Sequence, residues 1–578
     1  MYRFIAIVGH AVQSGEERRP DPDAVLSTLG LTRRVTASSL SLFASDETPV
    51  LELSEAGIVV GHLFSRSFTP VDYAALAPPS MSPALLRKHL LEHYWGEYVF
   101  LQSLEENDAL AVLREPSGGM PCFYRFVDGS GFVTSDISLA TRLGLFEKRI
   151  DWDVIVHSLT YPNLKTQRTG LVGIRELLPG CVLTVASSSV NAEVAWSPWA
   201  FVGEDRRFRD LSEAAASVRT AVTSVVKTWA EADRAILVEL SGGLDSSIVA
   251  ASLRGCSARI ICCTLAAPLL GGDEREYARP VTEYLGVDLQ EQELDFERSL
   301  FKFDLTVATP TPCVGGLRYI ASSVMSEIGA LRGTVSNISG GGGDTIFCYL
   351  TTAAPAADAL RERGLTAALR SVHDLSMLHQ CTFWKAGWLT AKRLFRSHNA
   401  YRDPVPLLLN PAVVTGTAGH HPWFDAPPSS YIGDRERIYD LSGTQRLREG
   451  ALRGIDRWLR MPLLSQPVVE ACLRTPTWMW IAGGRNRAVA REAFADILPP
   501  KVLNRRSKGT FMGYLGAAYQ RNKHAMQDFL LSGLLHQKGI LDAAALNGLI
   551  TGPQTPRDQS FVRVFELCTV ENWLRQQD

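Results

Sequence analysis

The chain has 578 residues, of which 46% are hydrophobic and 21% charged, and its formal net charge is −2 at pH 7. This length predicts about two to four domains, and the composition is typical of a globular protein with a substantial core. The near-neutral charge gives no general reason to expect binding to nucleic acid or to a membrane surface.

No stretch of the sequence approaches the ~18 consecutive apolar residues of a membrane span. The apolar stretch at 4–9 is too short for a signal peptide, so we expect a cytoplasmic protein. The ten cysteines are scattered, with no Cys-x-x-Cys pair and no Cys/His array at zinc-binding spacing. We therefore expect buried thiols rather than a structural metal or a disulfide framework.

Residues 1–200 are β-rich with some helix, and Gly and Pro separate the strand candidates. Those candidates are residues 2–8, 57–62, 98–101, 109–114 and 181–186. Residues 205–578 begin with helical periodicity. Strand and helix patterns then alternate at 235–240, 246–254, 259–265, 273–285 and 334–338. This alternation predicts a parallel sheet with helices on its faces, followed by a mostly helical region from about 355 onward.

A glycine-rich turn follows the strand at 235–240 and opens the next helix, with the sequence Ser241-Gly-Gly-Leu-Asp-Ser-Ser247. Its glycines let backbone N–H groups approach a phosphate, and the helix N-terminus and the serine hydroxyls add donors. A carboxylate repels phosphate, so Asp245 in this turn indicates a bridging Mg²⁺. The turn lacks the Gly-Lys-Ser/Thr of a Walker loop, which argues against γ-phosphoryl transfer. A strand–turn–helix without a ligand is the alternative.

A second glycine-rich stretch follows the strand at 334–338 and reads Ser339-Gly-Gly-Gly-Gly-Asp344. Four consecutive glycines lose much conformational entropy on folding, so they indicate backbone that lies against a nucleotide or an extended substrate. A flexible linker is the alternative. Two basic stretches lie further on, at 483–494 and 505–509, and an acidic stretch at 273–278 suits the first turn of a helix.

The turn at 241–247 resembles the pyrophosphate loop of the ATP pyrophosphatases related to asparagine synthetase. Those enzymes cleave ATP to AMP and pyrophosphate, so the resemblance implies an adenine nucleotide α-hydrolase-like domain that forms an acyl-adenylate. It also implies that Asp245 and Asp344 hold Mg²⁺ on the pyrophosphate oxygens and that the ammonium of Lys508 contacts the α-phosphate. The implied ATP-binding residues are Leu240, Ser241, Gly242, Gly243, Asp245, Ser246, Ser247, Leu265, Ser339, Gly340, Gly341, Arg487 and Lys508.

Four stretches of the N-terminal region resemble successive markers of the glutaminase domain of asparagine synthetases, an α/β/β/α sandwich. They lie at 95–98, 114–118, 134–136 and 173–180. In that family a cysteine at the mature N-terminus hydrolyses glutamine, whereas this chain has Tyr2 and its first cysteine is Cys122. The resemblance thus implies a two-domain α/β protein. An inactive glutaminase-like domain spans 1–200, and a synthetase domain spans 205–578 and does not use ammonia from glutamine.

Gly341 departs from two branches of the family, because asparagine synthetases carry glutamate at this position and β-lactam synthetases carry tyrosine. A base for the nucleophile must then come from elsewhere in the chain. Asp374 lies where β-lactam synthetases place the carboxylate partner of that tyrosine, so Asp374 and the adjacent His373 are the candidate catalytic residues. An ordinary pair on a helix surface is the alternative.

Stretches at 372–375, 421–423, 462–467 and 483–494 resemble segments of lasso-peptide cyclases. That resemblance implies an AMP-forming ligase that adenylates the side-chain carboxylate of an Asp or Glu in a leader-processed core peptide. The N-terminal amine of the peptide then closes a macrolactam ring. The implied partners are the precursor peptide and the leader peptidase and leader-binding protein of the same pathway, with no nucleic acid and no membrane.

Three other functions remain open at this level. One is an ammonia-dependent asparagine synthetase or a β-lactam-synthetase-like cyclase of a small molecule. A degenerate synthetase fold that only binds its ligand is disfavoured by the retention of Asp245, Asp344 and Lys508. Sulfur or amine transfer to tRNA is disfavoured by the near-neutral charge and by the lack of a catalytic cysteine pair.

Overall fold

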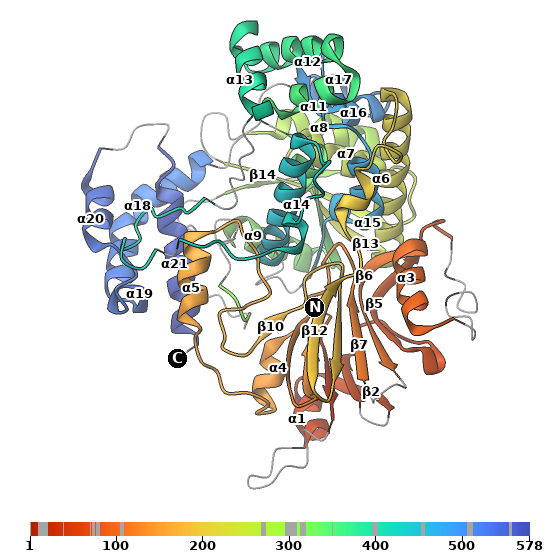
Figure 1. Ribbon diagram of the computed structural model, residues 1–578, viewed down its shortest axis with the longest axis vertical. Helices are drawn as coiled ribbons and strands as arrows, with labels where there is room; N and C mark the ends of the chain where they lie inside the picture. The colour runs from red at the N-terminus through yellow and green to blue at the C-terminus, as the bar shows by residue number, and fades with distance from the viewer. Residues whose placement is uncertain are drawn as a thin grey trace.

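The computed structural model has two β-sheets packed face to face in the N-terminal region and a parallel sheet in the rest of the chain (Figure 1). The predicted α/β class is therefore confirmed. The described residues are 2–9, 21–37, 40–69, 71, 76, 81–104, 109–267, 273–294, 309–312, 319–349, 351–395, 403–414, 416–451, 457–505, 512–553 and 558–577. Within these residues, no helix has the length and apolar character needed to span a membrane.

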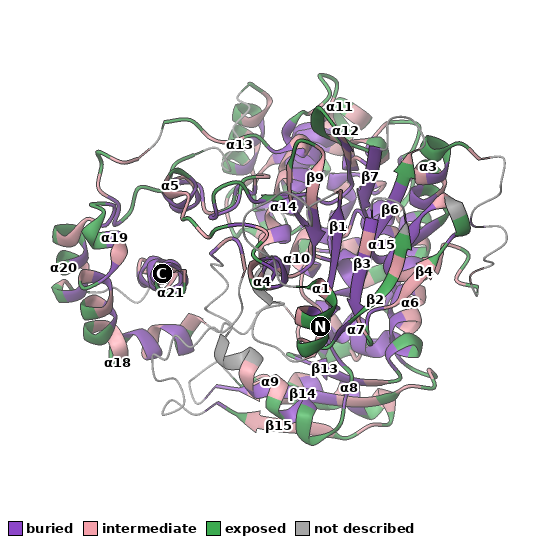
Figure 2. Ribbon diagram, turned by 90° about the horizontal axis from the view of Figure 1, so that it is seen from below, coloured by how far each residue is buried: buried purple, intermediate pink, exposed green. Residues whose placement is uncertain are grey.

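The N-terminal region is a sandwich of two antiparallel sheets. In spatial order, the first sheet comprises β10 (Arg175–Glu176), β8 (Phe123–Val127), β9 (Ser130–Thr134), β1 (Phe4–Val8), β3 (Leu40–Ser45) and β2 (Leu31–Ala37). The second comprises β12 (Ser189–Val194), β11 (Cys181–Ala186), β7 (Ala109–Arg114), β6 (Tyr94–Leu104), β5 (Ile58–Ser65) and β4 (Val50–Glu52). Figure 2 shows that buried residues dominate the central strands β1, β3, β6 and β7.

The sandwich forms because buried apolar residues alternate between the two faces of strands such as β1. Phe4, Ala6 and Val8 pack into the core between the sheets, whereas Ile5 and Ile7 pack outward into a core that includes helices. The result is the α/β/β/α arrangement that the glutaminase resemblance implies. The helices on the outer faces are α1 (Pro22–Thr28), α4 (Ile137–Arg142) and α5 (Trp152–Thr160) on the first sheet and α3 (Pro83–His93) on the second.

The synthetase region is built on a parallel sheet whose central strand is a continuous apolar run. In β13, residues 236–238 have no exposed surface, as expected of a strand that helices cover on both faces. In spatial order the sheet comprises β15 (Leu289–Glu293), β14 (Arg259–Ala266), β13 (Ala235–Glu239), β16 (Ser336–Ser339) and β17 (Trp458–Arg460). The predicted strands at 235–240, 259–265 and 334–338 are thus confirmed as β13, β14 and β16.

Helices surround this sheet and make up most of the chain that follows it. Those around the sheet include α6 (Leu211–Asp233), α7 (Leu244–Ser252), α8 (Arg275–Leu285) and α9 (Tyr319–Leu331). Those after β16 include α10 (Gly343–Ile346), α11 (Ala354–Arg363), α12 (Leu365–Leu378), α13 (Phe383–Phe395), α14 (Ile432–Ala451), α15 (Gln466–Leu473), α16 (Ala488–Ala493) and α17 (Pro500–Leu503).

The last helices of the chain leave the sheet and return to the N-terminal region. They are α18 (Met512–Leu531), α19 (Leu534–Gln537), α20 (Ala543–Thr551) and α21 (Phe561–Arg575). Leu567 of α21 shares an apolar core with Ile155 and Leu159 of α5, and Figure 1 shows α21 next to α5. Arg563 of α21 also donates a hydrogen bond to the carbonyl of Leu159 at 2.6 Å.

A buried arginine joins the sandwich to the parallel sheet. Arg460, at the end of β17, is fully buried and donates two hydrogen bonds to the carboxylate of Asp233, both at 3.0 Å. It donates a third to Glu97 of β6 at 2.5 Å and a fourth to the hydroxyl of Tyr2 at 3.0 Å. Its guanidinium also lies 4.0 Å from the ring centroid of Trp229. A buried charge is tolerated only when it is paired in this way.

We expect Arg460→Met to lower the free energy of unfolding by about 3–5 kcal/mol, because Asp233 and Glu97 would keep buried charges that have lost a partner. Urea unfolding followed by tryptophan fluorescence measures the loss. The matched control is Arg34→Met, since Arg34 pairs with Asp46 at the surface and such pairs contribute about 0–1 kcal/mol. Equal midpoints for the two variants would contradict the role of the buried network.

Candidate active site

Two glycine-rich loops lie next to each other at the carboxyl end of the parallel sheet. β13 and β16 are neighbours in register, with Glu239 opposite Ser339 at their ends, and one loop leaves each strand directly after this pair. The first leads into α7 and the second into α10. Open α/β sheets bind ligands outside the carboxyl ends of their strands, so both motifs belong to one site.

The first loop is shaped to start α7. Gly242 has φ = +64°, and a Cβ at this position would lie 2.5 Å from the Cβ of Tyr277, so only glycine fits. The Oγ of Ser241 accepts a hydrogen bond from the N–H of Gly243 at 3.4 Å and lies 3.0 Å from the Oγ of Ser246. Two hydroxyls and the N-terminus of α7 thus converge where the family resemblance places pyrophosphate.

Three of the predicted ATP-binding residues are buried or half-buried. Leu240 and Ser247 have no exposed surface, and their backbone N–H groups donate to the carbonyls of Cys263 and Gly243, at 2.8 Å and 3.1 Å respectively. Leu265 is half-buried in β14. Leu240 thus ties the end of β13 to β14, and Ser247 closes the first turn of α7. The contact of all three residues with ATP stays a prediction.

The second loop needs its glycines because it packs directly on the start of α7. A Cβ on Gly340 would lie 2.6 Å from the backbone N of Ser246, and a Cβ on Gly343 would lie 2.4 Å from the Cγ of Asp245. Neither position can carry a side chain without moving the neighbouring loop. The stretch is therefore a packed element of the site, and the alternative of a flexible linker is wrong.

Gly341 lies between these contacts and is tied back to the strand ends. The hydroxyl of Ser339 donates to Glu239 at 2.8 Å and accepts from the N–H of Gly341 at 3.2 Å. A Cβ on Gly341 would meet the Cε of Met461 at 3.2 Å, which is a tight contact. A side chain at this position would therefore require the end of the Met461 side chain to shift by a few tenths of an ångström.

Asp245 and Asp344 converge on one cation, the guanidinium of Arg487. Nη1 of Arg487 donates to Oδ1 of Asp245 at 3.1 Å, and Nη2 donates to Oδ1 of Asp344. The structure thus brings together the two predicted Mg²⁺ ligands and the predicted phosphate-binding arginine. The side chain of Asp245 is 12% exposed and that of Asp344 is 49% exposed, so a ligand can reach the pair from the side of Asp344.

The carboxylate pair fits a magnesium ion. Mg²⁺ is usually held by one or two carboxylates together with waters and substrate phosphates, and these two carboxylates already meet around a single positive group. In the part of the chain that the structure describes, no group of three or more His, Cys, Asp or Glu could hold a metal. Phosphate oxygens and water would therefore have to complete the coordination of Mg²⁺ by Asp245 and Asp344.

Arg505 holds the first loop in place, although it was not predicted as a site residue. It donates to the carbonyl of Gly242 at 3.1 Å, forms an ion pair with Glu274 at 2.7 Å and lies 3.9 Å from the ring centroid of Tyr277. The sequence signals for this contact are the acidic helix start at 273–278 and the basic stretch at 505–509, which carry opposite charges. Lys508, the catalytic lysine predicted in the same basic stretch, lies outside the described residues.

The two candidate bases, Asp374 and His373, lie in different environments on α12. Asp374 is buried in α12, and its Oδ1 accepts the N–H of Gly484 at 3.1 Å. Gly484 lies in the hairpin of β18 (Ile481–Ala482) and β19 (Arg485–Asn486), directly before Arg487. Asp374 therefore positions the hairpin that presents Arg487, whereas His373 is exposed on another face of α12.

The start of the N-terminal sandwich holds an aromatic residue in a buried polar cluster. The ring of Tyr2 stacks on Trp458 with centroids 3.4 Å apart, and its hydroxyl bonds to His62 and Arg460. Burial raises the pKa of Tyr2 to about 12, and burial likewise raises the pKa of the Cys122 thiol to about 12. Neither group is an activated nucleophile at neutral pH.

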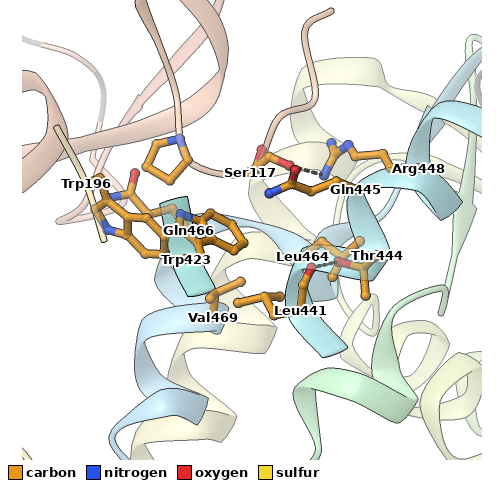
Figure 3. A pocket seen from close by; sticks show the side chains of 11 residues that line it. Ser117, Trp196, Trp423, Leu441, Thr444, Gln445, Arg448, Leu464, Gln466 and Val469 are labelled. Carbon is orange, nitrogen blue, oxygen red and sulfur yellow. Dashed lines mark hydrogen bonds between the residues drawn. The ribbon is translucent and has the colours of Figure 1, made fainter. Parts of the chain in front are cut away.

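A small cavity lies between the sandwich and the helices of the synthetase region (Figure 3). Ser117 lines it from the sandwich, and Gln445 of α14 and Gln466 of α15 line it from the other side. The indoles of Trp196 and Trp423, with centroids 5.8 Å apart, close one end. Its volume of about 20 Å³ gives room for about one water molecule, so it is too small to hold a substrate.

The two glycine-rich loops and the carboxylate pair lie within a region that a protein-family model matches. The family model for asparagine synthase matches residues 217–575, which is more than half of the chain, and the chain belongs to this family.

Two curated relatives are similar over part of their length. The amidase chyE of Penicillium rubens is 24% identical over 373 residues, which cover 59% of this chain and 53% of that protein. The glutamine-hydrolysing asparagine synthetase 3 of Bacillus subtilis is 25% identical over 213 residues, which cover 37% of this chain and 31% of that protein. The matches therefore span about half or less of these relatives.

Among solved structures, the glutamine phosphoribosylpyrophosphate amidotransferase of B. subtilis, complexed with ADP and GMP, is 11% identical with a TM-score of 0.21. That match covers 58% of this chain and 74% of the other. A likeness of this size adds nothing to the fold described above.

We expect Asp245→Asn and Asp344→Asn each to weaken the Mg²⁺-dependent binding of ATP by at least about tenfold, since even outer-shell changes cost about 10–100-fold in metal affinity. The amide keeps the shape of the side chain and removes the charge that the metal requires. Isothermal titration with a non-hydrolysable ATP analogue, with and without Mg²⁺, measures the effect.

The control for these variants is Asp496→Asn, because Asp496 pairs with Arg219 at an exposed position away from both loops. It should bind Mg²⁺ and nucleotide as the wild type does. An unchanged Mg²⁺-dependent affinity in either loop variant would remove the metal assignment.

Proposed function

We propose that the protein is a peptide macrocyclase of the lasso type. It would use ATP to adenylate the side-chain carboxylate of an Asp or Glu in a leader-processed core peptide, and the N-terminal amine of that peptide would close a macrolactam. The observation that carries the proposal is the pair of facing loops. They hold groups that can activate a carboxylate, and at Gly341 they have no side chain that could bind or deprotonate a separate nucleophile.

The activating half of the reaction rests on the first loop and the carboxylate pair. The hydroxyls of Ser241 and Ser246 and the N-terminus of α7 would bind the β- and γ-phosphates. Asp245 and Asp344 would hold Mg²⁺, which supplies charge neutralisation on the departing pyrophosphate. The substrate carboxylate attacks the α-phosphorus, the bond to the β-phosphate oxygen breaks, and pyrophosphate leaves with the electron pair.

The amine in the second half would come from the peptide itself. It attacks the acyl carbon, AMP leaves with the electron pair of the broken C–O bond, and the amine loses a proton as the amide forms. The high pKa of Cys122 and the bonding of Tyr2 to Arg460 argue against ammonia release from glutamine in the sandwich. Ring closure gains from proximity, because the amine and the acyl carbon belong to one chain.

Incubation of the protein with ATP, Mg²⁺ and a core peptide with a free N-terminus should give a product that has lost one water, detected by mass spectrometry. One AMP and one pyrophosphate should appear for each ring. Where a precursor peptide is used instead, the leader peptidase and leader-binding protein of the pathway would have to be added. Formation of AMP with free aspartate and ammonia, without any peptide product, would favour the small-molecule alternative and contradict the proposal.

Lys508→Ala should reduce the turnover of adenylation by ~10²–10³-fold, equal to about 2.7–4 kcal/mol of transition-state stabilisation, by analogy with the loss of one oxyanion donor. Pre-steady-state formation of AMP measures the chemical step. Lys501→Ala is the matched control, since Lys501 carries the same charge in the same region and pairs with Glu276 at an exposed position. A change in the apparent affinity for peptide alone would contradict the catalytic role of Lys508.

A further inference from the structure

Arg487 occupies the position between Asp245 and Asp344 at which a shared Mg²⁺ would have to bind. Its two terminal nitrogens are hydrogen-bonded to one carboxylate each. The residue is 7% exposed, and its guanidinium carries a positive charge. The positive charge that keeps the two carboxylates close is therefore provided by the protein itself.

The guanidinium and a metal ion cannot use the same oxygens at once. Both carry positive charge, and repulsion at contact distance is strong where the side chains are shielded from water. Mg²⁺ can bind the Oδ1 atoms of both Asp245 and Asp344 only if Arg487 moves away from them. Its departure would need another anion to accept the guanidinium.

Arg487 is built to make that exchange. Its Nε is buried and has no hydrogen-bond partner among the described residues, which is a costly state that an incoming acceptor would relieve. Its backbone lies in the left-handed region with φ = +55°, at the end of a hairpin that Asp374 holds through Gly484. The backbone is thus anchored, while the guanidinium is bonded to the two carboxylates.

Two other arginines lie near Arg487 and add positive charge beside it. Arg485 and Arg491 lie on the same hairpin and helix. Burial and then the charges of Arg487 and Arg485 lower the pKa of Arg491 to about 10. A phosphate group entering beside Arg487 would meet the charges of these two arginines and the unpartnered Nε of Arg487.

We propose that Arg487 occupies the metal position and neutralises Asp245 and Asp344 when no nucleotide is bound. The phosphates of the nucleotide then attract its guanidinium away from the two carboxylates, and Mg²⁺ binds them instead. Metal and nucleotide then bind with positive coupling, and the metal alone binds weakly. The coupling is reciprocal, so each ligand raises the affinity for the other by the same factor. The inference rests on the use of Mg²⁺ and ATP at this site, and it is independent of which carboxylate is activated.

The test is titration of Mn²⁺ into the protein without nucleotide, followed by electron paramagnetic resonance of the free ion. In Arg487→Met the carboxylates lose their internal cation, so the affinity for Mn²⁺ alone should rise by about tenfold or more. The coupling between Mn²⁺ and ATP should fall by a similar factor, while the part that comes from direct ligation of Mn²⁺ by the phosphates persists. An arginine that only binds phosphate would lower the ATP affinity and leave the affinity for Mn²⁺ alone unchanged, and that result would overturn the proposal.

Two further variants make the result specific. Arg485→Met removes the same charge from an exposed position on the same hairpin and should leave the affinity for Mn²⁺ alone unchanged. Arg487→Lys keeps the charge without the planar fork that bridges two carboxylates, so it should give an intermediate Mn²⁺ affinity even if Arg487→Met folds poorly. Equal Mn²⁺ affinities in Arg487→Lys and the wild type would contradict the proposal.

The experiment also separates this inference from the proposed function. Mn²⁺ binding is measured without any acyl substrate, so failure to form a macrolactam leaves its outcome unaffected. If the wild type binds no Mn²⁺ even with saturating ATP, the ATP chemistry of the proposed function fails together with the exchange at Arg487.

Discussion

The site depends on two carboxylates that are held close together. Asp245 and Asp344 come from loops that pack so tightly that Gly343 leaves no room for a Cβ beside Asp245. Two negative charges in this arrangement need a positive one between them, and Arg487 supplies it. A guanidinium that bridges two carboxylates needs a fixed backbone. The hairpin before Arg487 provides it, and the hydrogen bond from Gly484 to Asp374 holds that hairpin.

The N-terminal sandwich helps to hold the second glycine-rich loop in place. Arg460 ends β17, which is the neighbour of β16, and the next residue, Met461, lies against Gly341. Glu97 of the sandwich holds Arg460 and thereby the edge strand β17, which pairs with the strand β16 from which the second loop leaves. The sandwich thus has a structural role, since it completes the buried ionic network next to the site.

Much of the fold follows from local patterns. The strands β13, β14 and β16 are apolar runs bounded by turn residues, and the two glycine-rich loops are contiguous, so both could be predicted from the sequence. β15 could not, because its Leu-Gln-Glu-Gln-Glu sequence is that of a half-buried edge strand whose carboxylates pair with Arg275 and Arg279. The bridge by Arg487 spans 242 residues to Asp245, and the contact of Arg505 with the first loop spans 263. No short-range pattern encodes such pairings, and a buried carboxylate such as Asp374 looks the same in sequence whether it is a base or a hairpin anchor.

The return of α21 to α5 bears on how the chain folds as it is made. Arg563 and its acceptor Leu159 are 404 residues apart in sequence, which corresponds to roughly 20–80 s of synthesis at about 5–20 residues per second. Once β12 has been made, the sandwich has the strands of both sheets, but it lacks the helix that covers Ile155 and Leu159 until α21 follows. The N-terminal region is therefore first to leave the ribosome and among the last to be covered, and its exposed apolar face is where association with chaperones or with other nascent chains would begin.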